Sequence, residues 1–262
     1  MRPFEVNPMN ETIRLLQNHR SIRRYAPRPI PEEMVEAIIR SAQAASTSSY
    51  VQAYTIIGVT DPAKKKALAE LSGNAHVETC PLFLVFCADL RRLRVAAARH
   101  GVEAQVEGTE PFLVATVDAA LAAQNAAVAA ESLGLGICYI GGIRNRIAEV
   151  CQLLEIPRLV YPVFGMTVGF PADEPGKKPR LPLEAVFHRE RYEPERDRHL
   201  DVYDETVRRY YTERTGGQRT HGWTAYIAGL LKEPRRTHML DFLRRQGFLQ
   251  DTLGAAGRGE RP

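Results

Sequence analysis

The sequence predicts an α+β fold in which helices surround one mixed β-sheet. Apolar runs of strand length alternate with helical segments, but their order does not form the regular series of a doubly wound fold. The 262 residues are 44% hydrophobic and 25% charged, an ordinary globular balance. A chain of this length can bury a sizeable core without disulfides.

The N-terminal region contains clear helix and strand boundaries. Asn10 is suited to cap a helix over 11–18, because its side chain can accept a hydrogen bond from the first turn. Pro31 is expected to open a second helix at its favoured first position. A strand is predicted at 55–59, and the helix that follows it should end at Gly73.

Two long apolar segments mark the predicted centre of the core. Residues 81–88 form a continuous apolar run of strand length, which is typical of a strand covered on both faces. Residues 111–133 form an alanine-rich helix. Asp118 and Glu131 within it would be costly in a membrane, so a core helix is expected and no membrane span. The polar 91–108 segment between them predicts a mobile excursion.

The second half of the chain is predicted to hold a strand ending at 139–142, a helix at 144–155, a strand at 161–169, an extended connection over 171–194 and a helical, basic and aromatic part from about 199. We expect one domain over 1–250, with a C-terminal helical extension from about 195. A flexible tail is expected at 251–262, where glycine and arginine dominate.

Charge and cysteine content restrict the function classes. The net charge of +4 is mild and suits anionic small molecules at least as well as nucleic acid. The four cysteines form no C-x-x-C pair and lie in apolar sequence, which predicts buried free thiols in a reducing cytoplasm. The N-terminal sequence lacks the apolar segment of a signal peptide.

Hydrolase, metal and nucleic-acid motifs are not found in the sequence. The seven histidines show no metal-ligand spacing, so no metal site is expected. The serines of 46–49 lack the G-x-S-x-G setting of a nucleophile elbow. The C-terminal arginines lack the recognition-helix or aromatic context of a nucleic-acid binder.

Two glycine groups suggest different roles. Gly134 and Gly136 follow a helix rather than a strand, which favours a helix C-cap over a dinucleotide-binding loop. Gly141 and Gly142 stand at a strand exit, where paired glycines let a flat ligand approach the backbone closely.

Two basic groups could bind a phosphate. His19, Arg20, Ser21 and Arg23 concentrate donors after the first helix, and arginine grips phosphate through charge-assisted hydrogen bonds. The same residues could instead complement the helix macrodipole, and the segment alone does not decide between the two readings. Lys178-Pro179-Arg180 is a second compact basic group. It supports a phosphate site only if the fold brings it close to the first group.

Taken together, these segments resemble the nitroreductase superfamily, in particular its oxygen-insensitive NADPH nitroreductases and NADPH-flavin oxidoreductases. The resemblance covers nearly the whole chain, from about residue 10 to about 250. It is carried by HRSIRRY at 19–25, SAQAASTSSYVQ at 41–52, AAQNAAVAAESLGLG at 122–136, YIGG at 139–142, FGMTVGFPAD at 164–173, KPRLP at 178–182 and LDFLRRQGF at 240–248. It implies a domain-swapped homodimer that binds FMN at the dimer interface.

The resemblance also implies which residues bind FMN. His19, Arg20, Ser21 and Arg23 match contacts to the phosphate and one ring edge, joined by Lys178 and Arg180. Tyr139, Ile140, Gly141 and Gly142 match the segment against the flavin ring. Thr47, Ser48 and Ser49 match a serine-rich loop from the other subunit, with threonine where relatives more often have serine. Asn74 falls near a flavin-contacting glutamine of relatives, where this chain is one residue shorter.

The expected reductant is NADPH. Arg214 and Arg219 match two arginines that bind its 2′-phosphate in relatives, while Arg235 and Tyr50 match residues at the acceptor pocket. No catalytic side chain is expected, because flavin N5 exchanges the hydride. Nitroaromatics, quinones, free flavin and metal oxyanions are all open as small-molecule electron acceptors.

Three other functions differ from this one in what they predict. Another enzyme on the same scaffold, such as a dehalogenating relative, is expected to lack the long basic C-terminal extension. A non-catalytic flavin-binding redox sensor or partner-binding protein would not consume NADPH in steady state. A nucleic-acid binder would show strongly salt-dependent binding to DNA.

Overall fold

The computed structural model describes residues 9–251. The chain forms two compact units, Met1–Pro175 with His238–Pro262 and, between them, Gly176–Thr237. The prediction of one domain over 1–250 stays a prediction, and the predicted tail at 251–262 lies outside the described residues except for Asp251.

The first unit is built on a sheet with the strand order β1-β2-β4-β3. Its strands are β1 (Tyr54–Val59), β2 (Leu82–Asp89), β3 (Gly136–Ile140) and β4 (Val160–Gly169). All three strand pairs in the described part of the chain are antiparallel, so the expectation of a mixed sheet is wrong for these residues. The periodicity of a strand does not show whether its neighbour runs parallel or antiparallel. The strand directions could therefore not be predicted from the sequence pattern. The α+β class is confirmed.

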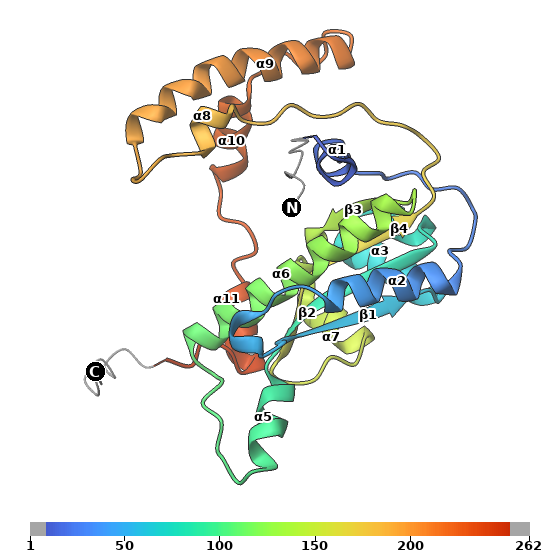
Figure 1. The fold of residues 1–262 in the computed structure, drawn as a ribbon, viewed down its shortest axis with the longest axis vertical. Helices are drawn as coiled ribbons and strands as arrows, with labels where there is room; N and C mark the ends of the chain where they lie inside the picture. The colour runs from blue at the N-terminus through green and yellow to red at the C-terminus, as the bar shows by residue number, and fades with distance from the viewer. Residues whose placement is uncertain (1–8, 252–262) are drawn as a thin grey trace, which may run out of the picture. The chain divides into compact units, whose positions relative to one another are not determined.

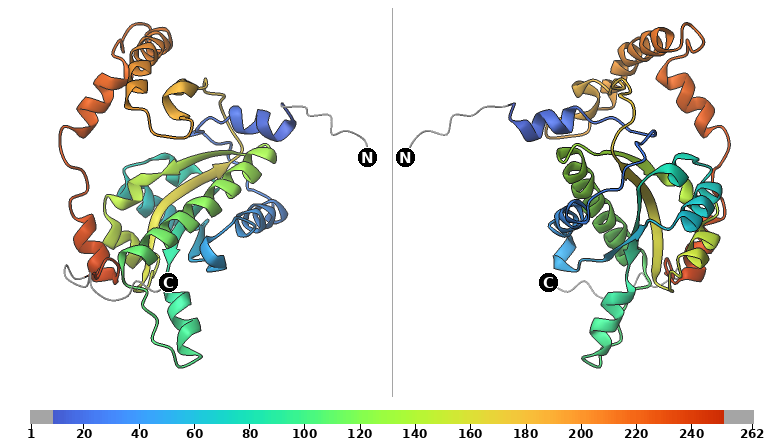
Figure 2. Two further views of the ribbon diagram at one scale, coloured as in Figure 1. Left: turned by 60° about the vertical axis from the view of Figure 1, so that its left-hand side comes forward. Right: turned by 90° about the vertical axis from the view of Figure 1, so that its right-hand side faces the viewer.

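Helices cover both faces of this sheet, as Figure 1 and Figure 2 show for the first unit. The bounds of its helices are α1 (Glu11–Gln17), α2 (Glu32–Gln43), η1 (Ser48–Tyr50), α3 (Pro62–Ser72), α4 (His76–Thr79), α5 (Arg91–Ala98), α6 (Thr109–Ser132), η2 (Gly141–Arg144), α7 (Ile147–Leu153) and α11 (Met239–Gln246). Helices α2 and α6 pack together on one face, while α3 and α7 belong to the other.

The central strand β2 explains the continuous apolar run at 81–88. Leu82, Leu84 and Phe86 belong to the core cluster with α2 and α6. Phe83 and Val85 belong to the opposite cluster with α3 and α7. Because successive side chains point to opposite faces, both faces of the strand are buried and the run has no polar alternation.

Helix α6 is long and apolar enough to cross a membrane by length and composition alone. It is a core helix, as expected, because most of its alanines are buried in the α2-side cluster. Leu133 follows it as the C-cap and Gly134 takes a left-handed conformation, with φ of 77°. Gly134 therefore ends the helix, as the sequence predicted.

Other boundaries confirm or adjust the sequence predictions. Asn10 caps α1 through its side chain, and Gly73 ends α3 with φ of 68°. Pro31 is the N-cap of α2 rather than its first helical residue. Within the 91–108 segment, for which the sequence predicts a mobile excursion, Arg91–Ala98 forms the helix α5.

The second unit is mainly helical. It holds α8 (Leu183–Val186), η3 (Pro194–Arg198), α9 (His199–Arg214) and α10 (Trp223–Leu231). Tyr203 of α9 packs edge-on against Trp223 of α10, with ring centroids 5.8 Å apart. After α10 the chain returns to the first unit, where Gln246 donates to the carbonyl of Pro157 at 2.7 Å.

Candidate functional site

The basic segment after α1 is fixed to the end of the sheet. The Ile22 amide donates to the carbonyl of Ile137 in β3 at 2.9 Å. Ile22 is buried over Gly136, where an added β-carbon would lie 2.4 Å from Ile22 Cγ1. Tyr25 bonds Thr167 Oγ1 at 2.6 Å, and burial of its ring raises the Tyr25 pKa. The residues on either side of Ile22 are thus held on a rigid support.

Two of the basic side chains of this segment are paired with carboxylates. His19 Nδ1 lies 2.6 Å from Glu131 Oε1 of α6. Arg20 Nη1 donates to Glu174 Oε1 at 2.7 Å, and Glu174 is 82% exposed. Arg23 donates to the carbonyl of Ser21 at 3.5 Å. An ion pair with an exposed carboxylate contributes little free energy, so Arg20 can exchange Glu174 for another anion at little cost in free energy.

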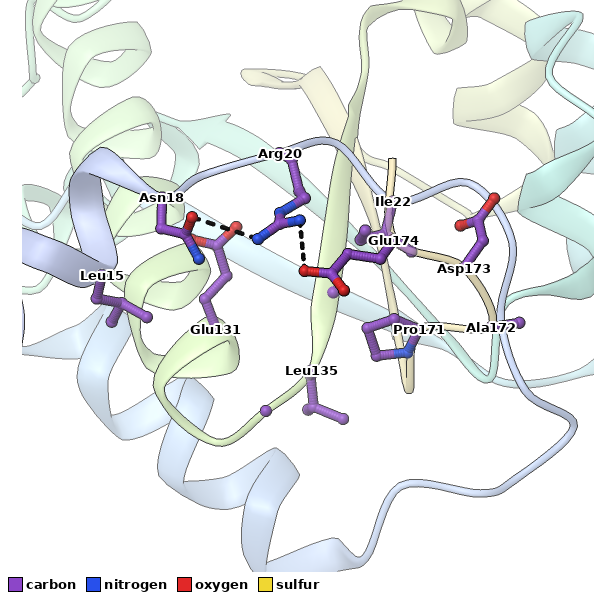
Figure 3. A pocket seen from close by; sticks show the side chains of 12 residues that line it. Leu15, Asn18, Arg20, Ile22, Glu131, Leu135, Pro171, Ala172, Asp173 and Glu174 are labelled. Atoms are coloured by element: carbon purple, nitrogen blue, oxygen red, sulfur yellow. Dashed lines mark hydrogen bonds and ion pairs between the residues drawn. The ribbon is translucent and has the colours of Figure 1, made fainter. Parts of the chain in front are cut away.

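Figure 3 shows the cavity beside Arg20, which has a volume of ≈ 510 Å³. Besides Arg20, its charged lining consists of the carboxylates Glu131, Asp173 and Glu174. Neither Ser21 nor Arg23 lines it. Three carboxylates around one arginine disfavour a phosphate, so this cavity does not coincide with the predicted phosphate site.

The predicted ring-binding residues Gly142 and Asn74 lie against each other. A β-carbon at Gly142 would lie 2.3 Å from Asn74 Nδ2 and 2.4 Å from the carbonyl oxygen of Ser72. The Asn74 side chain is held there by donating to that carbonyl at 2.8 Å. Gly141 and Gly142 begin η2 directly after β3, where the sequence placed a strand exit. The structure therefore brings together two residues that lie far apart in the sequence and were assigned to one site.

Tyr139 and Ile140, the other two residues of that segment, are held by the core. Tyr139 packs edge-on against Phe164 at 5.2 Å between ring centroids and donates to Gln124 Oε1 at 3.2 Å. Burial, together with the charge of Glu131, raises the pKa of Tyr139. Ile140 is buried in the cluster with α3 and α7.

His76 was not singled out in the sequence, yet it lies close to the basic segment. Its Nε2 atom is buried and has no hydrogen-bond partner among residues 9–251. Burial lowers the pKa of His76, and the charge of Arg23 lowers it further. A buried polar atom without a partner is what a bound polar group could satisfy. No spacing motif in the sequence could have found it.

The 47–53 loop carries Thr47, Ser48, Ser49 and Tyr50. Both of its ends are bonded to Asp118 of α6, a residue that the sequence analysis considered only as a polar group in an apolar helix. The Tyr50 side chain is 83% exposed. Thus three predicted flavin-contacting residues and one predicted pocket residue share a single outward-facing loop.

In the second unit, a cavity of ≈ 410 Å³ brings together predicted residues from distant positions. Its basic lining includes Lys178, Arg180 and Arg219. Its aromatic lining consists of Tyr203, Tyr211, Trp223 and Tyr226. Aromatic faces and cations in one cavity suit an anionic ligand that contains a flat ring.

The other two predicted arginines do not line this cavity. Arg214 donates to the hydroxyl of Tyr210, and Arg235 lies exposed after α10. Lys178 and Arg180 belong to the second unit and Arg23 to the first, so their meeting at one phosphate stays a prediction.

Comparison with known proteins assigns most of the chain to two family models. Residues 16–170 match the Nitroreductase family, and residues 178–251 match the Nitroreductase family, C-terminal domain. A curated FMN reductase (NADPH) from Bacillus subtilis (strain 168) is 49% identical over 246 residues, which cover 92% of this chain and 99% of the relative. An oxygen-insensitive NADPH nitroreductase from Salmonella typhimurium (strain LT2) is 43% identical over 242 residues, covering 92% and 99%.

Among solved structures, the NfrA1 nitroreductase from B. subtilis superimposes with a TM-score of 0.89. It is 47% identical and covers 92% of this chain and 100% of that chain. The similarity therefore extends over both units and is not confined to the sheet.

Proposed function

Because the chain belongs to the nitroreductase family, we propose that it is an FMN-dependent NADPH oxidoreductase that reduces nitroaromatics, quinones or flavins. Its activity class is that of the NAD(P)H-dependent FMN reductases and nitroreductases, to which it is similar over nearly its full length. Bound FMN would take a hydride from the nicotinamide and return two electrons to the acceptor. The side chains of this protein would bind and orient the cofactor and its substrates and shield them from solvent. None is needed as a nucleophile.

The contact between Asn74 and Gly142 carries the proposal. A flat cofactor needs backbone that it can approach closely, and Gly141 supplies it, because a β-carbon there would meet only the end of the Arg144 side chain at 3.3 Å. The place of a side chain at Gly142 is filled by Asn74 and Ser72. Asn74 supplies an amide beside that backbone, in place of the longer glutamine of relatives. The buried Nε2 of His76, without a partner among the described residues, adds an unsatisfied polar atom near Arg23. These residues fit a polar, ring-containing cofactor.

We assign the FMN phosphate to His19, Arg20, Ser21 and Arg23, with Lys178 and Arg180. Two observations support this assignment. The first group is fixed to β3 through the Ile22 amide, and Arg20 is paired with an exposed carboxylate that another anion can replace. A cation near the flavin pyrimidine would stabilise the anionic reduced ring and thereby favour two-electron over one-electron transfer.

We assign the adenosine end of NADPH to Arg219 and the aromatic residues of the second-unit cavity, while Lys178 and Arg180 of that cavity are assigned to the FMN phosphate. Arg219 lines this cavity beside Trp223 and Tyr226, which offer flat surfaces. Arg214 lies one helical turn from Tyr210 and is assigned a secondary role at the 2′-phosphate. Tyr50 and Arg235 are assigned to the acceptor pocket.

We propose that the protein is a domain-swapped homodimer. Leu113, Val117 and Leu121 of α6 are all exposed and recur every four residues, so they form one exposed apolar stripe along the helix. A second copy of the chain could cover this stripe. In that dimer Thr47, Ser48 and Ser49 would contact the flavin bound mainly by the partner. The four free cysteines support a reducing, cytoplasmic location.

FMN titration of the apoprotein tests the assignment. A charge-assisted hydrogen bond is worth about 1.5–3 kcal/mol, so Arg23→Ala or Arg180→Ala should weaken FMN binding by about tenfold to a hundredfold. Arg24→Ala is the matched control, because Arg24 is 78% exposed and lies 4.0 Å from Asp173. Unchanged affinity in both variants would exclude these arginines as phosphate ligands.

A further inference from the structure

Asp118 is a fully buried carboxylate in an alanine-rich helix, with a solvent exposure of 0%. A buried charge is tolerated only where hydrogen bonds replace its hydration. Asp118 obtains two from one loop: Oδ1 accepts from the Ser48 amide at 3.1 Å and Oδ2 accepts from the Ala53 amide at 3.0 Å. Each carboxylate oxygen therefore holds one end of the 47–53 loop.

The loop needs such support because its backbone is strained. Ser49, Tyr50 and Gln52 have φ of 46°, 60° and 51°, in the left-handed region that side chains other than glycine rarely adopt. Within the loop, Thr47 Oγ1 accepts from the Gln52 amide at 3.3 Å. At 3.3 Å this side-chain bond is longer than the two that Asp118 accepts, at 3.1 and 3.0 Å.

A second side chain supports the C-terminal end of the loop. Arg92 of α5 donates to the carbonyl of Tyr54 at 2.9 Å and to Thr55 Oγ1 at 2.9 Å. Arg92 is in turn held by Asp89, 3.6 Å away. The Ser48 and Ala53 amides thus bond to α6, and the Tyr54 carbonyl just beyond the loop bonds to α5.

We propose that Asp118 is the positioning residue that fixes the 47–53 loop for its role at the flavin and acceptor site. This inference rests on the proposed function, which places Ser48, Ser49 and Tyr50 at that site. Asp118 directly follows Val117, which is exposed on the apolar stripe of α6. The helix that faces the second subunit therefore also sets the position of the loop that reaches the second subunit's flavin.

The chemistry of the contact requires an aspartate. An asparagine has one acceptor oxygen and one NH₂ group, so it would face one of the two amides with a donor instead of an acceptor. A serine is smaller, removes the buried charge and can satisfy at most one amide. Both substitutions should loosen the loop, and the serine variant tests the idea even if donor–donor repulsion prevents the asparagine variant from folding.

The experiment compares Asp118→Asn and Asp118→Ser with Thr116→Val, a matched control on the same helix. Thr116 hydrogen-bonds the Phe112 carbonyl at 2.7 Å and Tyr161 at 2.6 Å, and neither partner belongs to the loop. In the Asp118 variants, hydrogen exchange of the Ser48 and Ala53 amides should accelerate at least about tenfold, and the FMN dissociation constant should rise about tenfold. At saturating FMN, the acceptor KM should rise more than kcat changes, because Tyr50 is displaced while the flavin is still reduced by NADPH. Thr116→Val should leave all three quantities close to wild type.

Two outcomes would overturn the proposal. If amide exchange at Ser48 and Ala53 is unchanged, Asp118 does not hold the loop. If exchange accelerates but FMN affinity and acceptor KM stay at wild-type values, the loop does not serve the site. Wild-type protein that takes up no FMN would instead contradict the proposed function, and the amide exchange would still decide whether Asp118 fixes the loop.

Discussion

The amide of Asn74 lies so close to Gly142 that a β-carbon on the glycine would come within 2.3 Å of Asn74 Nδ2. The same β-carbon would meet the backbone oxygen of Ser72 at 2.4 Å. A side chain could swing away, but the Ser72 carbonyl belongs to the main chain and cannot move without shifting the end of α3. Glycine is thus required at position 142 by its neighbours, whatever it binds.

Gly142→Ala should therefore destabilise the protein and weaken FMN. Overpacking of this kind costs about 1–3 kcal/mol, which urea unfolding can measure. Gly58→Ala is the matched control, because a β-carbon there would make ordinary contacts at 3.8 Å or more. If both variants are equally stable and bind FMN equally, the close approach at Gly142 does not constrain the site.

Val117→Glu should dissociate the proposed dimer. Val117 is 53% exposed in the middle of the apolar stripe, so a glutamate there would bury a charge in the subunit interface. Sedimentation should show a monomer with reduced FMN content. Leu240→Glu, at an exposed leucine of α11, serves as the control and should stay dimeric. A fully dimeric Val117→Glu protein would place the interface elsewhere.

Arg219→Ala should reduce the preference for NADPH over NADH more than Arg214→Ala does. Arg219 lines the second-unit cavity, whereas Arg214 is engaged with Tyr210. If an arginine adds about 1–2 kcal/mol to a partly solvated phosphate contact, its removal should lower kcat/KM for NADPH about five- to thirtyfold with little effect on NADH. Equal use of both nucleotides by the wild type would remove the 2′-phosphate assignment.

Stability should fall at alkaline pH because buried acids must stay protonated. Burial raises the pKa of Cys80 and Cys151 from 9.0 to about 12, and that of Tyr161 from 10.0 to about 12. Unfolded chains lose these protons first. The stabilising contribution is therefore complete below pH 9.0, the ordinary thiol pKa, and is lost as pH rises toward about 12.

Urea unfolding over that pH range measures the loss. Tyr161→Phe removes one of the ionising groups and should make stability less sensitive to pH, at the cost of the bond to Thr116. The thiols should also resist a thiol reagent near neutral pH in the folded protein. Rapid modification of Cys80 or Cys151 in folded protein would show that they are not buried in solution.

Many helix ends and strands could be predicted from residues that are close together in the sequence. Gly73 and Gly134 were identified as helix ends because only glycine readily adopts their left-handed backbone. The β2 run was identified as a doubly covered strand because it lacks polar alternation. Strand direction depends on pairing between distant segments, so the antiparallel sheet could not be predicted from periodicity.

The residues of the candidate site also divide into those predicted from local motifs and those recognised only in the fold. Motif resemblance proposed Gly142 and Asn74, and their contact is visible only in the fold. Asp118 and His76 carry no motif, because their importance arises from burial and from partners more than fifty residues away in the chain. At the cavity beside Arg20, a residue that was assigned to the phosphate site is surrounded by carboxylates. The sequence alone does not place those carboxylates near Arg20.

Anaerobic reduction of the purified protein tests the central claim most directly. The purified protein should hold one FMN per chain, whose flavin absorbance near ~450 nm is lost on adding NADPH and returns on adding a quinone. Protein that binds no FMN when it is supplied, or whose bound flavin is not reduced by NADPH, would contradict it.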